Sequence, residues 1–208
     1  MKGEVKKIVV MGLGYIGLPT ASLLATKGNQ VLGVDINEAA VDTINKGEIH
    51  IVEPDLDLLV KSAVNSGNLR AALTPEEADI FILAVPTPFK DDHVPDIRYV
   101  EAATRTIAPY VAAGNIVILE STSPVGTTER VRDILAEERP ELFSSSSQKQ
   151  IHVAHCPERV LPGQILKELV TNDRIIGGVD QASRDATADF YRTFVSGEVF
   201  VADARSAE

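Results

Sequence analysis

The sequence predicts an α/β domain built on a doubly wound parallel sheet with helices on both faces. Short apolar segments rich in β-branched residues alternate with segments in which apolar residues recur at helical spacing. Residues 80–85 (IFILAV) and 116–119 (IVIL) are continuous apolar runs, which are typical of strands buried on both faces. Because crossovers between parallel strands are right-handed, this alternation closes naturally as a doubly wound sheet.

The individual elements follow from local signals. The apolar run 7–11 is closed by glycines, and the helix after it is stopped by Gly28 and Asn29. In the segment 97–111, Val100, Ala103, Ile107 and Val111 share one helical face. In chain order, the expected strands are 7–11, 31–34, 80–85, 116–119, 151–154, 174–177 and 199–201, and the expected helices are 16–27, 38–45, 55–64, 97–111, 128–138 and 181–194. Residues 142–150, with a serine run at 144–147, predict a mobile surface loop inside one domain that spans 1–208.

Composition excludes several classes of protein. A net charge of −10 argues against general nucleic-acid binding, and no apolar run approaches the roughly 20 residues of a membrane span. The lone cysteine, Cys156, allows no internal disulfide and fits a cytoplasmic protein. That cysteine and four scattered histidines show no metal-ligand spacing, so we expect no metal site.

A glycine-rich turn and an aspartate predict a dinucleotide site. Gly12-Leu13-Gly14-Tyr15-Ile16-Gly17 is a G-x-G-x-x-G motif that follows a strand and opens a helix, where backbone N–H groups bind a diphosphate. Asp35 ends the next strand, at the place of the carboxylate that binds the adenosine ribose. Because no lysine or arginine follows directly, the sequence favours NAD over NADP. The alternatives are a plain glycine turn, and an Asp35 or Asn37 that only caps the next helix.

Polar residues gather after the later strands, where open α/β sheets bind ligands. Pro86 and Pro88 fix the backbone around Thr87, which could face a ligand or simply form a rigid turn. The segment 120–128 (ESTSPVGTT) carries five hydroxyls, of which Thr127 or Thr128 could cap a helix. Ser121 and Thr122, at the strand end itself, suit a polar ligand or an ordered water.

The segment 155–163 (HCPERVLPG) suggests a substrate loop. Glu158 could act as a general acid or base or order water, and Arg159 could meet an anionic substrate. The alternative is a surface salt bridge between these two side chains. Cys156, next to His155, could be read as a nucleophile, but neighbours in sequence do not place a base at a thiol, so we expect a buried, inert thiol.

Together, the segments MGLGYIGLPTA, VLGVDIN, FILAVPTPF, ILESTSPVGTTE, HVAHCPERVLPG and NDRIIGG resemble the UDP-glucose/GDP-mannose dehydrogenases. They span nearly the whole chain, and the form HCPERVLPG is most similar to members that act on UDP-N-acetyl-D-mannosamine. The resemblance implies a Rossmann-like NAD-binding domain from an enzyme that oxidises a UDP-sugar at C6 with two NAD⁺, through a cysteine-bound intermediate. Pro162 replaces a second glutamate of the family's motif, so a role for that acid does not carry over.

The resemblance also implies a role for each motif. Gly12, Gly14, Tyr15, Ile16, Gly17 and Asp35 would hold the adenosine diphosphate of NAD, and Pro86, Thr87 and Ser121 would lie beside the ribose and nicotinamide. Thr122 and Glu158 would be catalytic, positioning water and assisting proton transfer. The sequence Glu158, Arg159, Val160 and Leu161 would border the UDP-sugar.

The family's nucleophilic cysteine and catalytic lysine have no counterpart in this sequence, and neither do its central and C-terminal UDP-binding domains. We therefore expect part of a longer, homodimeric or larger enzyme, which binds NAD and is inactive alone. The main alternative is a stand-alone NAD-binding or redox-sensing module. A β-hydroxyacid or 6-phosphogluconate dehydrogenase shares the first half of the pattern but gives no account of the Glu158 loop.

Overall fold

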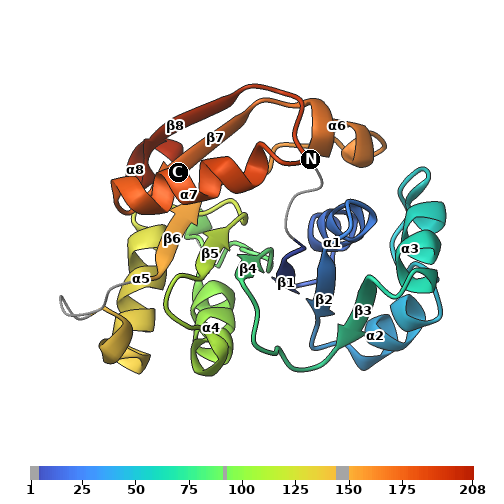
Figure 1. The fold of residues 1–208 in the computed structure, drawn as a ribbon, viewed down its shortest axis with the longest axis horizontal. Helices are drawn as coiled ribbons and strands as arrows, with labels where there is room; N and C mark the ends of the chain where they lie inside the picture. Colours follow the sequence, from blue (N-terminus) through green and yellow to red (C-terminus); the bar gives the residue numbers. More distant parts are fainter. Residues whose placement is uncertain (1–4, 91–92, 144–149) are drawn as a thin grey trace.

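The computed structural model describes residues 5–90, 93–143 and 150–208, which form one twisted sheet flanked by helices (Figure 1). Within these ranges the sheet has eight strands in the order β3-β2-β1-β4-β5-β6-β7-β8. Their bounds are β1 Lys7–Met11, β2 Gln30–Val34, β3 Leu69–Ala72, β4 Ile80–Leu83, β5 Ile116–Leu119, β6 His152–His155, β7 Arg174–Gly178 and β8 Val199–Asp203. No helix of this part of the chain combines the length and the apolar content needed to cross a membrane.

The strand order confirms a doubly wound sheet. From β1 the chain winds outward through β2 and β3, then crosses back to β4 on the other side of β1 and continues to β5 and β6. One neighbour pair departs from the expected parallel sheet, because β6 and β7 run antiparallel, with Ala154 opposite Gly178 and His155 opposite Gly177. Apolar runs such as Ile175 and Ile176 look the same in either direction, so the sequence carried no signal for this reversal.

Helices cover both faces of the sheet (Figure 1). They are α1 Gly17–Thr26, α2 Glu38–Asn45, α3 Leu56–Asn65, α4 Arg98–Ile107, α5 Thr127–Glu138, α6 Ile165–Thr171, α7 Gln181–Tyr191 and α8 Ala204–Ala207. Successive strand residues point to opposite faces, so Ile80 and Ile82 pack in the core under α1, α3, α6 and α7. Phe81 and Leu83 pack in the second core, under α4 and α5.

Most expected elements are confirmed, and the misses have physical reasons. The edge strand β3 was missed because four residues with an exposed Arg70 show too little apolar character, and seven-residue α6 was missed because it is short. Helix α4 ends at Ile107, ahead of the expected end, because Pro109 lies in a 3₁₀ turn, Ala108–Tyr110. Of the expected loop 142–150, residues 144–149 lie outside the described residues.

Candidate functional site

The glycine turn after β1 lies at the point where the sheet reverses its winding, between β2 and β4. Gly12 has a φ of +90°, and a Cβ there would lie 2.8 Å from the carbonyl oxygen of Ala84. A Cβ on Gly17 would lie 1.8 Å from the carbonyl oxygen of Gly12. These two glycines are therefore required by the turn and by the close packing of α1 on the sheet.

Gly14 differs from its two neighbours, because a Cβ there would meet nothing within 4 Å. The protein's own packing thus gives no reason for a glycine at this position, whereas a ligand that approaches the backbone would. The N-terminus of α1 follows directly, with Ile16 at the N-cap and no capping side chain. Uncapped N–H groups beside an open glycine fit the diphosphate of a dinucleotide. Tyr15 is 53% exposed beside this turn.

Asp35, at the end of β2, is tied to the glycine turn. Its Oδ2 accepts a hydrogen bond from the backbone N–H of Leu13 at 2.8 Å, and its Oδ1 accepts one from Asn37 at 2.9 Å. The capping alternative holds for Asn37, whose side chain accepts from Ala39 and Ala40 at the start of α2, but not for Asp35. Asp35 is half-buried beside the turn.

The ends of β4 and β5 are joined by side-chain hydroxyls. The Thr87 hydroxyl donates to the carbonyl oxygen of Thr122 at 2.6 Å, and the Ser121 hydroxyl donates to that of Val85 at 2.6 Å. Pro86 and Thr122 are exposed. The two predicted segments are thus brought together, with Thr87 and Ser121 fixing the backbone on either side of Thr122.

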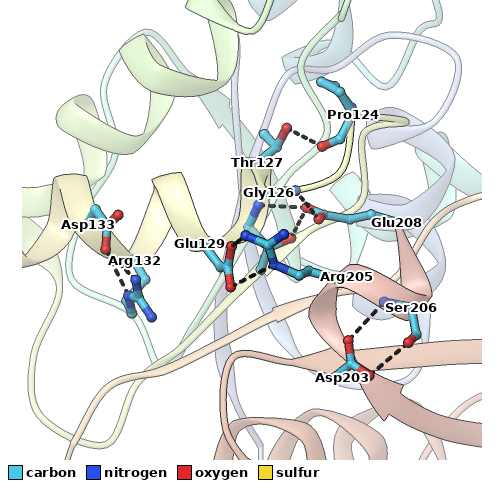
Figure 2. Close-up of polar contacts among 11 residues, drawn as sticks. Pro124, Gly126, Thr127, Glu129, Arg132, Asp133, Asp203, Arg205, Ser206 and Glu208 are labelled. Carbon is cyan, nitrogen blue, oxygen red and sulfur yellow. Dashed lines mark hydrogen bonds and ion pairs between the residues drawn. The ribbon is translucent and has the colours of Figure 1, made fainter.

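Thr127 and Thr128 do not cap α5 with their own hydroxyls, contrary to the sequence-based alternative. Gly126 is the N-cap and has no side chain, and the Thr127 hydroxyl donates to the carbonyl oxygen of Pro124. The cap comes instead from Glu208 in the segment that follows α8, which accepts from the N–H of Gly126 at 2.6 Å (Figure 2). No local pattern in the sequence predicts a contact across 82 positions.

Glu158 and Arg159 do not form the salt bridge with each other that the sequence allowed. Glu158 is paired with Arg174 of β7, and both side chains are 2% exposed. The other carboxylate oxygen, Oε1, accepts from the backbone N–H of Arg159 at 2.8 Å, while the exposed guanidinium of Arg159 bonds to the carbonyl oxygen of Asp173. Burial is the largest single influence on the pKa of Arg174 and lowers it, but the facing Glu158 carboxylate, together with Cys156 and Tyr191, raises that pKa overall.

The remaining loop residues differ in exposure. Val160 packs partly buried against the core, whereas Leu161 is 61% exposed. Beside the loop lies a cavity of about 250 Å³, and its lining residues are Pro157, Glu158, Arg159, Asn172, Asp173 and Arg174. Both arginines and Glu158 thus border a space at the end of β6.

Glu53 is a loop-holding residue that sequence reasoning missed. This buried side chain accepts hydrogen bonds from the backbone N–H groups of Gly163 and Ile165, both at 2.8 Å, and so fixes the end of the 155–163 loop and the start of α6. The nearest available signal was an acid between Val52 and Pro54, which does not identify partners 110 positions away.

Cys156 is fully buried in the core, as the sequence analysis expected. Burial, followed by the nearby Glu120 carboxyl, raises the pKa of its thiol. A thiol that is buried and protonated is a poor nucleophile. Among the described residues, no three His, Cys, Asp or Glu side chains are grouped so that they could hold a metal ion.

Comparison with known proteins agrees with this geometry. Residues 6–195 match the family model described as UDP-glucose/GDP-mannose dehydrogenase family, NAD binding domain. The chain is 56% identical over 208 residues to an NDP-N-acetyl-D-galactosaminuronic acid dehydrogenase of Ralstonia nicotianae, covering 99% of this chain and 49% of the relative. It is also 56% identical to the UDP-N-acetyl-D-mannosamine dehydrogenase of Escherichia coli, covering 97% and 49% of the two chains.

A solved structure shows the same arrangement. The UDP-N-acetyl-mannosamine dehydrogenase of Staphylococcus aureus superposes with a TM-score of 0.90 at 46% identity, covering 97% of this chain and 48% of that one. The chain spans about half the length of the curated relatives that it matches. Because the family model matches residues 6–195, this chain belongs to the UDP-glucose/GDP-mannose dehydrogenase family and contains that family's NAD-binding domain.

Proposed function

We propose that this chain is the N-terminal portion of a cytoplasmic, NAD-dependent UDP-sugar 6-dehydrogenase whose substrate is UDP-N-acetyl-D-mannosamine. The single observation that carries the cofactor part is Gly14, whose backbone borders open space next to the uncapped N-terminus of α1. An N-acetylated sugar is supported by the two relatives at 56% identity, one named for N-acetyl-D-galactosaminuronic acid and one for UDP-N-acetyl-D-mannosamine. The mannosamine form is supported by the HCPERVLPG segment. Relatives of about twice the length favour part of an enzyme over a stand-alone module.

In this proposal the glycine turn binds the diphosphate of NAD, and the half-buried Asp35 accepts hydrogen bonds from the adenosine ribose while keeping its bond to Leu13. Thr87 and Ser121 hold the backbone that faces the nicotinamide half. When bound, NAD⁺ supplies the acceptor for the hydride of the alcohol. The nucleophile that the family's reaction requires would come from outside these 208 residues, so this portion alone binds NAD without turnover.

Thr122 and Glu158 stay the candidates for positioning water near the sugar. Thr122 is exposed at the end of β5, with its carbonyl held by Thr87. Glu158 borders the cavity beside β6, but both of its oxygens accept hydrogen bonds within the protein. We propose that it reaches water by exchanging one of these bonds, and that Arg159, Val160 and Leu161 border the UDP-sugar.

The test is Gly14→Ala, compared with Gly17→Ala. Both variants add one methyl group to the same turn, but only the second would clash with protein atoms. Gly14→Ala should keep the free energy of unfolding within about 0.5 kcal/mol of wild type and lose most NAD⁺ affinity in calorimetric titration. Gly17→Ala should be destabilised. Unchanged NAD⁺ affinity of Gly14→Ala would contradict the role of Gly14 in binding NAD. Steady NADH formation by the 208-residue chain with NAD⁺ and UDP-N-acetyl-D-mannosamine would contradict the expected inactivity.

A further inference from the structure

A cluster of polar side chains is buried beneath the ends of β5 and β6. Glu120 is 3% exposed, and its Oε1 accepts a hydrogen bond of 2.5 Å from the hydroxyl of Tyr191 on α7. The Arg174 guanidinium lies over the ring of the same tyrosine, 5.8 Å from its centroid, and is paired with Glu158. The cluster connects the residue before Ser121 with the substrate loop, because the N–H of Glu158 also reaches the carbonyl oxygen of Glu120 at 3.4 Å.

The cluster holds two carboxyl groups and one cation. Arg174 directs Nη1 to Glu158 and Nη2 to the carbonyl oxygen of Leu169, and its Nε has no partner among the described residues. None of its hydrogen bonds reaches Glu120. An ionised carboxylate that is buried without a cation costs several kcal/mol, so the usual response of such a group is to take up a proton.

Two buried atoms of this cluster lack a hydrogen-bond partner among the described residues. Glu120 Oε2 and the hydroxyl of Thr20 on α1 are both buried without a hydrogen-bond partner in the described chain. Thr20 lies near enough to Glu120 to affect its carboxyl group. On a protonated Glu120, Oε2 would donate to the hydroxyl of Thr20 and satisfy both atoms. On an ionised Glu120 the hydroxyl would instead donate to Oε2, an arrangement that lowers the pKa of Glu120. Burial, followed by the charge on Glu158, raises the pKa of Glu120 from 4.5 to about 7.

We propose that Glu120 is a positioning residue that carries a proton. It stays neutral between Tyr191 and Thr20, so Glu158 is the carboxylate with which Arg174 forms its ion pair. The groups facing it are Thr20 from α1, Tyr191 from α7, Arg174 from β7, and Cys156 and Glu158 after β6. Ionisation of Glu120 puts a second negative charge beside Glu158 and draws Arg174 away from it. The Arg159 N–H, which Glu158 orients, then loses its fixed acceptor. The importance of this loop for catalysis rests on the proposed function; the protonation of Glu120 does not.

The first experiment is infrared spectroscopy of the 208-residue chain with the isosteric variant Glu120→Gln. Wild type at pH 6 should show a carbonyl band of a protonated carboxylic acid, which is absent from Glu120→Gln and fades with a midpoint near pH 7. Tyr191→Phe removes a donor that favours the anion, so its midpoint should move to higher pH. The exposed Glu198→Gln is the control and should leave the band unchanged. Absence of the band at pH 6, or its persistence in Glu120→Gln, would overturn the proposal.

The second experiment follows stability against pH. The pKa of Glu120 is raised in the folded chain, so its favourable contribution is complete below about pH 4.5 and is lost as the pH rises through about 7. Between these values, the unfolding equilibrium constant of wild type relative to Glu120→Gln should rise by about tenfold per pH unit. Parallel curves for the two proteins would contradict the proposal.

A third measurement tests the link to the loop. Exchange of the Arg159 amide, corrected for its intrinsic pH dependence, should accelerate above pH 7 in wild type but not in Glu120→Gln. Equal acceleration in both proteins would show that the ionisation of Glu120 does not affect the Arg159 amide. None of these measurements uses NAD or a UDP-sugar, so a failure of the proposed function would appear separately, as absent NAD⁺ binding with the infrared band intact.

Discussion

Glu208 accepts hydrogen bonds from both the backbone N–H and the hydroxyl of Thr128, at 2.7 and 2.6 Å, although Thr128 lies 80 positions earlier in the chain. The same carboxylate accepts from Gly126, and Arg205 pairs with Glu129 in the first turn of α5 (Figure 2). Helix α8 is itself fitted against β7, where a Cβ on Gly177 would lie 2.4 Å from that of Ala207. The end of the described chain thus holds the start of α5, which begins at Thr127, shortly after the Ser121–Thr122 segment.

Glu208→Ala should therefore lower the free energy of unfolding by about 1–2 kcal/mol, because the first N–H groups of α5 lose their acceptor. Glu208→Gln keeps an acceptor oxygen and should lose less. Chemical denaturation measures the difference, and hydrogen exchange at Gly126 and Thr128 should accelerate in the alanine variant. Glu198→Ala removes an exposed carboxylate near β8 and serves as the control. Equal losses for the two alanine variants would show that Glu208 does not cap α5.

The buried pair of Glu158 and Arg174 predicts a strongly non-additive mutant cycle. Arg174→Met leaves the Glu158 carboxylate buried without its cation and should cost about 3–5 kcal/mol. Adding Glu158→Gln removes the stranded charge, so the double variant should be more stable than Arg174→Met. For comparison, Arg192→Met breaks an ion pair with Asp189 in which both side chains are more than half exposed, and should cost less than about 1 kcal/mol. A double variant less stable than Arg174→Met would contradict the prediction.

The carboxylate of Asp35 predicts a preference for NAD⁺ over NADP⁺, because it would repel a 2′-phosphate on the ribose. Asp35→Asn keeps an acceptor for the Leu13 N–H but removes the charge. It should therefore lower the ratio of NAD⁺ affinity to NADP⁺ affinity by about tenfold or more, which is ~1.4 kcal/mol of binding free energy. Calorimetric titration of both cofactors measures the gap. Asp42→Asn makes the same charge change on the exposed side of α2 and should leave it unchanged. Tighter binding of NADP⁺ than of NAD⁺ by the wild-type chain would overturn the role given to Asp35.

Local signals in the sequence determined most of the fold and part of the site. The helix at 38–45 and the strand at 116–119 have the predicted bounds, because a capping Asn37 and a four-residue apolar run act over short distances. The glycine motif and Asp35 are found together for the same reason, since fixed spacing along a βαβ unit fixes their distance in space. Cys156 is buried as expected, since a small thiol in an apolar strand end packs in the core.

Only the tertiary structure decided the partners that lie far apart in the chain. Arg174 carried no functional signal in the segment NDRIIGG, yet the antiparallel pairing of β6 and β7 places it against Glu158. Glu53, Glu120 and Glu208 are ordinary acids in the sequence, and each acquires its role from a backbone group or side chain more than 70 positions away. Periodicity reports which face of an element is buried, but burial of a charge depends on which partner the fold brings to it.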